Sequence, residues 1–257
     1  MKNINLIILL FGGFLINAQE KQPILDMHLH ALPAAQNGPV PNAICAPPET
    51  MPFHDPATPW AQVFGEWIQN PDCENAIWGP VTDTEVMDET LRILEKHNIY
   101  GITSGSLLDD YMKNGGERII PGVGFSFFKA DMTPEKVQEL LSSEKYKVFG
   151  EVGIQYNGVS PSDSLFAPYA AIAEELDIPM GIHVGTGPPG AAYLPGVQNY
   201  RGKLHSPLVV EELLMRHPKL RIYLMHAGYP MIDDLLAVLW THPQVYVDVG
   251  VICYAIP

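Results

Sequence analysis

The sequence predicts an α/β protein of the TIM type, a (β/α)8 barrel in which seven of the eight strands are present. Two observations support this fold class. From residue 82 onward, apolar strand-like stretches alternate with helical stretches, which is typical of parallel strands joined by right-handed crossovers. In addition, His28-Leu29-His30 ends the first strand, where an open doubly wound sheet normally carries a glycine-rich phosphate loop.

The expected strands are short apolar runs that end in polar or glycine-rich segments. They cover residues 24–30, 99–103, 119–125, 148–154, 178–184, 220–227 and 245–251. Helices are expected between them, at residues 165–176, 207–216 and 231–240. Two further helices have clear starts, because Thr82 and Glu85 fit a capping box and Thr133 precedes a proline at the first helical position.

Residues 31–80 form an insertion after the first strand. This segment contains ten prolines together with Cys45 and Cys73, so we expect irregular structure with one short helix near residues 60–69. Its many aromatic residues favour a segment that folds over one end of the domain. Cys45 and Cys73 can form a disulfide, whereas Cys253 is expected to be a buried free thiol in the last strand.

The first 18 residues are typical of a signal peptide, with Lys2 before an apolar run and a small residue, Ala18, at the expected cleavage site. A membrane anchor is the alternative, but Gly12 and Gly13 interrupt the run, which is shorter than the ~20 residues of a membrane span. We therefore expect residues 19–257 to form the barrel of a secreted or periplasmic protein that has no membrane partner after cleavage.

The formal net charge of −14 argues against nucleic-acid and anionic-membrane partners, because an acidic surface repels phosphate groups. Removal of Lys2 with the signal peptide makes the charge one unit more negative. The expected partner is a small-molecule substrate, and a homo-oligomer is compatible with the sequence.

Potential metal ligands end four of the predicted strands: His28, His30, Glu151, His183 and His226. His28 and His30 project to the same side, because alternate residues of a strand share a face. In barrels of this type, catalytic groups collect at the carboxyl ends of the strands. Four imidazoles and a carboxylate suit one or two Zn²⁺ ions or another divalent transition metal, and a catalytic zinc activates water for hydrolysis.

These motifs resemble the amidohydrolase superfamily, specifically its amidohydrolase-related branch, over nearly all of the chain after Gln22. The resemblance rests on Asp26-Met27-His28-Leu29-His30, Gly150-Glu151-Val152-Gly153, His183-Val184-Gly185 and His226-Ala227-Gly228. It implies that His28, His30 and His183 bind a metal, and that His226 either binds a second metal or orients and activates the water. Glu151 stands where the family carries a carboxylated lysine, a glutamate or no bridging residue. His226 and Glu151 are therefore the expected catalytic residues.

Three functions agree with these residues. The first is a metal-dependent hydrolase that acts on an amide, ester or lactone bond of a small molecule. The second is a metal-dependent decarboxylase of an unsaturated or aromatic acid, which the resemblance also implies. The third is a metal-binding protein without turnover.

Other polar residues receive structural interpretations. Glu151 itself has the alternative of a buried carboxylate satisfied by backbone donors. Asp248 is expected to hydrogen-bond inside the barrel rather than bind metal. The three histidines at helix ends are expected to be structural: His97, His217 and His242. His54 and His205 are expected to be surface loop residues. Tyr193, Tyr200 and Arg201, in the loop after strand five, are expected to be solvated, with substrate contact as the alternative and Arg201 suited to a carboxylate.

The last expectation concerns the C-terminal end of the sequence. The family takes a further metal-binding aspartate from strand eight, and the sequence stops soon after strand seven. We therefore expect this chain to be a C-terminally truncated fragment, with an open barrel edge, weak metal binding and little turnover.

Overall fold

The computed structural model describes residues 22–46, 51, 53–127 and 129–255. The expected signal peptide, residues 1–18, lies outside this range. None of the described helices is long and apolar enough to cross a membrane.

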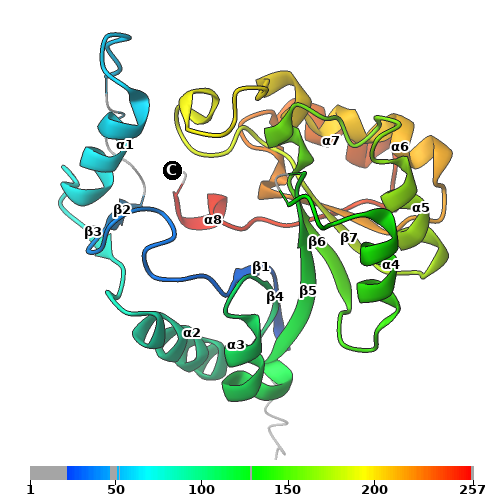
Figure 1. Cartoon of the computed structure of the whole chain (residues 1–257), viewed down its shortest axis with the longest axis horizontal. Helices are drawn as coiled ribbons and strands as arrows, with labels where there is room; N and C mark the ends of the chain where they lie inside the picture. The colour runs from blue at the N-terminus through cyan, green and yellow to red at the C-terminus, as the bar shows by residue number, and fades with distance from the viewer. Residues whose placement is uncertain (1–21, 47–50, 52, 128, 256–257) are drawn as a thin grey trace, which may run out of the picture.

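Seven parallel strands form one curled sheet with helices around its outer side (Figure 1). The chain therefore has the predicted TIM-type fold. Each strand pairs with the strand that follows it in this sheet, in the order β1 (Ile24–His30), β4 (Ile99–Ser104), β5 (Ile119–Phe125), β6 (Val148–Val152), β7 (Met180–His183), β8 (Ile222–Met225) and β9 (Tyr246–Val247). Several strands are shorter than expected, because 3-10 turns begin at Ile154 and His226, directly after β6 and β8.

The predicted helices are present: α2 (Asp83–His97), α4 (Pro134–Ser142), α5 (Ala167–Glu175), α6 (Glu211–Arg216) and α7 (Ile232–Thr241). The expected capping box at Thr82 and Glu85 and the Thr133 cap are both formed. An additional helix, α3 (Leu108–Gly115), was not predicted. It is only two turns long, with Leu108 and Tyr111 as its buried residues.

The insertion contains a small antiparallel pair, β2 (Ala43–Cys45) with β3 (Ala76–Trp78), and α1 (Trp60–Gln69). Cys45 and Cys73 form a disulfide that closes this segment. Trp60 is buried, and its indole Nε1 donates a hydrogen bond of 3.0 Å to the carbonyl of Pro189 in the loop after β7. The insertion, at the side of the sheet in Figure 1, is therefore joined to the loop that follows a predicted ligand strand.

The expectation for Cys253 is wrong. The last strand ends at Val247 rather than continuing to residue 251, because the backbone N–H of Gly250 bonds to the Asp248 carboxylate and Val251 has a left-handed backbone. A short helix, α8 (Ile252–Ala255), follows this turn, and Cys253 is an exposed free thiol on it.

The two edges of the sheet are β1 and β9, which are not paired with each other within the described residues. Ile24 and Leu25 on β1 are about half exposed, and Tyr246 on β9 is 73% exposed. This agrees with the expected open edge, while the expectation of a fragment stays a prediction. At the carboxyl ends of the strands, the Asp248 and His28 side chains meet.

Gly181 on β7 provides a test of how tightly the interior is packed. A Cβ at this position would lie 2.3 Å from the ring of Tyr223, which is buried. We expect Gly181→Ala to lower the free energy of unfolding by about 1–3 kcal/mol, because the ring must shift within a packed core.

The matched control is Gly65→Ala within α1, where a Cβ meets no atom within 4 Å. This change should raise helix stability by roughly 0.5–1 kcal/mol, because alanine loses less backbone entropy than glycine. Urea unfolding of both variants checks the pair, and equal stabilities would contradict the packing around Tyr223.

Candidate metal centre

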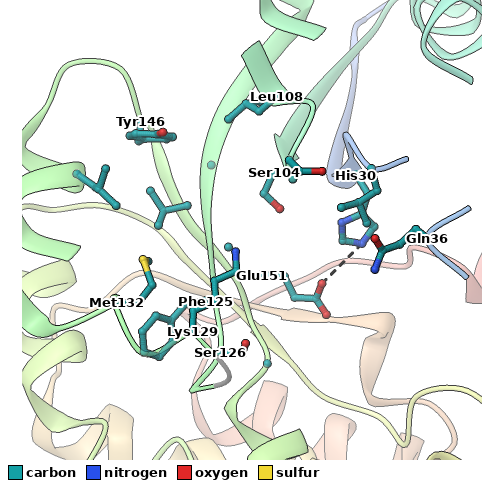
Figure 2. Close-up of a pocket in the computed structure, with 18 of the residues that line it drawn as sticks. His30, Gln36, Ser104, Leu108, Phe125, Ser126, Lys129, Met132, Tyr146 and Glu151 are labelled. Atoms are coloured by element: carbon teal, nitrogen blue, oxygen red, sulfur yellow. Dashed lines mark ion pairs between the residues drawn. The ribbon is translucent and has the colours of Figure 1, made fainter. Parts of the chain in front are cut away.

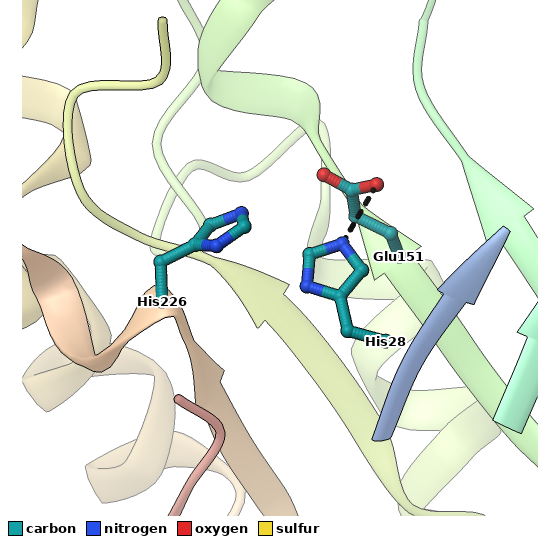
Figure 3. Close-up of side chains that lie close together, drawn as sticks. All are labelled: His28, Glu151 and His226. Carbon is teal, nitrogen blue, oxygen red and sulfur yellow. Dashed lines mark ion pairs between the residues drawn. The ribbon is translucent and has the colours of Figure 1, made fainter. Parts of the chain in front are cut away.

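The five predicted ligands meet at the carboxyl end of the sheet. His28 and His30 come from β1, Glu151 from β6 and His183 from β7, and His226 directly follows β8. The imidazole ring of His28 lies 4.8 Å from that of His30 and 4.6 Å from that of His226, and the rings of His183 and His226 are 4.7 Å apart. Figure 3 shows His28, Glu151 and His226 converging from three separate segments.

Three histidine Nε2 atoms surround the Glu151 carboxylate. The distances from its oxygens are 3.4 Å to His28, 3.6 Å to His30 and 3.7 Å to His183. Two ligand atoms that share one tetrahedral zinc at bond lengths near 2.1 Å lie about 3.4 Å apart. The observed spacing therefore fits donor atoms that converge on a common cation. Within the part of the chain that the structure describes, His28, Glu151 and His226 also form a group whose ligand atoms lie within 4.8 Å of one another.

The backbone conformation of His226 and the contact made by its Nδ1 fix the orientation of its imidazole ring. Its Nδ1 is 3.0 Å from the carbonyl oxygen of Gly250, so Nδ1 carries the proton and Nε2 keeps its lone pair. His226 and Ala227 both have left-handed φ values, 55° and 47°, which are uncommon for residues with a Cβ. Such conformations occur often at binding sites, where the surrounding structure maintains them.

Asp248 lies behind His28. Its carboxylate is buried, and one oxygen is 3.3 Å from His28 Nδ1, within ion-pair distance. A carboxylate on Nδ1 directs the Nε2 lone pair of a histidine toward a metal. Asp248 is thus a partner of a predicted ligand, and its contact with His28 joins the two edges of the sheet.

The histidines differ in protonation. Burial lowers the pKa of His226 and lowers that of His183 to about 3, so both imidazoles are neutral. Burial also disfavours the charged form of His28, but the adjacent Asp248 and Glu151 carboxylates outweigh it and raise the His28 pKa to about 9. Burial likewise raises the pKa of Glu151, yet the contact with His28 holds it below its usual range. Without a cation, a protonated His28 therefore lies between two ionised carboxylates and offsets one of their two negative charges, and metal binding must displace its proton.

A cavity of about 660 Å³ opens beside this cluster (Figure 2). His30 and Glu151 form its polar end, with Tyr156 also in its lining. Its lining also includes apolar residues and one lysine: Leu108, Val123, Phe125, Lys129, Met132 and Leu140. The cavity therefore has room for a small organic molecule next to the imidazoles.

Two loop residues expected to be solvated are buried instead. His205 has no exposed surface, and Tyr200 is buried with its hydroxyl donating to the carbonyl of Thr186. Both rings pack against Tyr156, which the sequence analysis missed. The loop after β7 turns back over the sheet, and an irregular loop carries no periodic signal of burial. Tyr193 and Arg201 are exposed as expected, and His54 is partly buried against Trp60.

The helix-end histidines have structural surroundings. His217 is 2.9 Å from Glu174, and His242 is 3.6 Å from Glu211. His97 is exposed at the end of α2.

The contact between Asp248 and His28 leads to a testable expectation. Asp248→Asn keeps the shape of the side chain but removes the negative charge behind His28, so we expect metal affinity to fall about 10- to 100-fold. Competition with a chromogenic chelator measures this change. Asp131→Asn, at an exposed position, is the control. Equal metal affinity in the two variants would show that Asp248 does not support the ligand.

A parallel TIM-type sheet with imidazoles and a carboxylate at its carboxyl edge defines a metal-binding barrel protein. The amidohydrolase family model matches residues 25–254. The match covers most of the sequence, and the chain belongs to the amidohydrolase family. None of the curated proteins matches the chain.

Three solved structures are similar to this chain, and the first of them supports the fold. An uncharacterized TIM-barrel protein from Bordetella bronchiseptica is 15% identical, with a TM-score of 0.56 over 92% of this chain and 78% of its own. A 2,6-dihydroxybenzoate decarboxylase from Rhizobium is 13% identical, with a TM-score of 0.46 over 86% of this chain and 70% of its own. A 5-carboxyvanillate decarboxylase from Novosphingobium aromaticivorans, complexed with manganese, is 15% identical, with a TM-score of 0.46 over 72% of this chain and 62% of its own.

Proposed function

We propose that this protein is a metal-dependent hydrolase that cleaves an amide, ester or lactone bond of a small molecule. The observation that carries the proposal is the set of three histidine Nε2 atoms within 3.4–3.7 Å of the Glu151 carboxylate, at the wall of a cavity of about 660 Å³. His28, His30, Glu151 and His183 are the proposed ligands, and His226 either completes a site of one or two ions or acts on the water.

Zinc is the proposed ion, because imidazole nitrogens with one carboxylate suit a borderline divalent metal. When bound, such an ion supplies Lewis acidity and lowers the pKa of water toward neutrality. The chain supplies the proton acceptors. His226 is neutral, with its Nδ1 proton held by Gly250, so its Nε2 can take a proton from water. Glu151, which the contact with His28 keeps ionised, is a second proton acceptor at the same site.

A decarboxylase of an unsaturated or aromatic acid is the second candidate. The observation that favours it is the apolar part of the cavity, where Phe125, Met132 and Leu140 suit a flat ring. Lys129 lines the same cavity and can pair with a carboxylate.

One experiment separates these candidates. Purified protein is analysed for Zn²⁺ and Mn²⁺ and then incubated with panels of esters, lactones, amides and aromatic acids in ¹⁸O-labelled water. Label in the product supports hydrolysis, whereas release of carbon dioxide from an acid without label in the remaining product supports decarboxylation. A protein that takes up metal but turns over no compound would support the third function, metal binding alone. Absence of stoichiometric metal after supplementation would contradict the proposal.

The role of Glu151 decides how many ions the site holds. Glu151→Gln keeps the side-chain volume but removes the charge that a bridging ligand needs. We expect the bound metal to fall from two ions to one only if the site is binuclear, and to stay at one ion with weaker affinity if it is mononuclear. Metal analysis after gel filtration measures this, with Glu175→Gln as the control because Glu175 is exposed on α5. Unchanged stoichiometry and unchanged affinity would remove Glu151 from the ligand set.

We also propose that the protein acts in the periplasm or outside the cell. The signal-type sequence of residues 1–18 supports this location, and so does the Cys45–Cys73 disulfide, since disulfides persist in oxidising compartments. Cell fractionation with sequencing of the mature N-terminus tests the expected cleavage after Ala18.

A further inference from the structure

Tyr156 has a contact that the metal site leaves unexplained. It belongs to the 3-10 turn Ile154–Asn157 that follows β6, and its hydroxyl oxygen is 3.2 Å from Nε2 of His183. This nitrogen also faces Glu151, at 3.7 Å. The tyrosine hydroxyl therefore occupies the neighbourhood of a proposed ligand atom, and Tyr156 lines the cavity as well.

Nε2 of His183 can bind either the Tyr156 hydroxyl or a metal ion, but not both at once. A neutral imidazole has one nitrogen that carries a proton and one with a single lone pair. When the Tyr156 hydroxyl donates to Nε2, the ring proton is on Nδ1, and this is also the tautomer that can bind a metal through Nε2. A cation can thus replace the hydroxyl proton at Nε2 without a change of tautomer, and the hydroxyl is then left without its acceptor.

The surroundings keep the hydroxyl at this place. The Tyr156 ring packs against the rings of His183, Tyr200 and His205, with centroids 5.0–6.0 Å apart. On the loop after β7, Gly187 has a φ of +71°, and a Cβ there would lie 2.3 Å from the Tyr156 hydroxyl oxygen. The loop therefore passes so close that the hydroxyl has little freedom to leave the cavity wall.

We propose that Tyr156 is a substrate-binding residue of this site, whose hydroxyl bonds to His183 in the metal-free protein and to a carbonyl or carboxylate oxygen of the substrate once a metal occupies Nε2. The assignment rests on the metal-dependent function proposed above and deepens it. It assigns the substrate a carbonyl or carboxylate oxygen held between the metal site and Tyr156. The hydroxyl acts as a neutral donor throughout, and no proton is transferred.

The test compares Tyr156→Phe with Tyr200→Phe, whose hydroxyl instead donates to Thr186. Zn²⁺ affinity is measured by chelator competition, and the affinity of acetohydroxamate for the zinc-loaded protein by calorimetry. For Tyr156→Phe we expect Zn²⁺ affinity to stay equal or to increase, because a competitor for Nε2 is lost. Acetohydroxamate affinity should fall about 10- to 100-fold, the effect of one hydrogen bond to a charged oxygen. Tyr200→Phe should alter neither value.

A second variant keeps the test valid if Tyr156→Phe does not fold. Gly187→Ala keeps the hydroxyl but pushes it away, so it should also weaken acetohydroxamate binding while Zn²⁺ still binds. Weaker Zn²⁺ binding in Tyr156→Phe would overturn the assignment, because it would make the hydroxyl a support or ligand of the metal. Unchanged acetohydroxamate binding in a zinc-loaded Tyr156→Phe protein would also overturn it, with the proposed function intact. Failure of the unmodified protein to bind Zn²⁺ would overturn both.

Discussion

Replacing His28 by alanine is expected to remove bound metal and catalytic turnover together. His28 is the most connected residue of the cluster, since it contacts Glu151 at 3.4 Å, Asp248 at 3.3 Å and the rings of His30 and His226. Loss of a group that only supports a metal ligand weakens metal binding by roughly 10- to 100-fold. Loss of the ligand itself should weaken it by more. Turnover should fall to background, because the proposed function depends on the ion.

The His28→Ala variant should also be less stable, because loss of the imidazole leaves the buried Asp248 carboxylate without its partner. His30→Ala offers a comparison, since its side chain is 40% exposed while that of His28 is 5% exposed. It should lose metal and turnover but keep its melting temperature. Metal analysis, activity and thermal unfolding are measured for both variants, with His97→Ala as a control at an exposed helix end. Retention of stoichiometric metal in His28→Ala would refute the proposed ligand set.

Replacing Phe149 by alanine should cause the largest loss of stability. Phe149 lies on β6, two residues before Glu151, and has no exposed surface. Its ring is 5.5 Å from that of Phe125 and 6.5 Å from that of Phe166. Removing a fully buried phenylalanine side chain costs about 3–5 kcal/mol, through lost burial and the cavity that remains.

The consequences extend to the site, because the same strand carries Glu151. We expect Phe149→Ala to unfold at lower urea concentration and to bind metal more weakly. The control is Trp240→Ala, a larger aromatic side chain on α7 that is 90% exposed, which should change stability by less than about 0.5 kcal/mol. Equal midpoints for the two variants would contradict the position of Phe149 in the core.

Local sequence patterns predict the order of the strands and the main helices, and they show which strand ends carry potential ligands. These features are local. A strand of seven residues such as β1 shows its apolar character and its alternation without reference to the rest of the chain, and the caps at Thr82 and Thr133 depend only on neighbouring residues. The parallel sheet then follows from the alternation, because consecutive parallel strands need a helical crossover. Carboxyl ends of parallel strands share one edge, so the meeting of His28, Glu151, His183 and His226 was predictable.

Long-range contacts bring further residues to these four. Tyr156, His205 and Asp248 reach the cluster through irregular turns, whose path depends on contacts with distant segments rather than on local pattern. His205 looked like a surface residue and is buried, because the loop after β7 folds back onto Tyr156 and Tyr200. Asp248 faces His28 because the chain turns after Val247, which also places Cys253 on an exposed helix. Periodicity reports burial only where the backbone is regular, so the sequence indicated the proposed ligands and an interior position for Asp248, but not the burial of Tyr156 and His205.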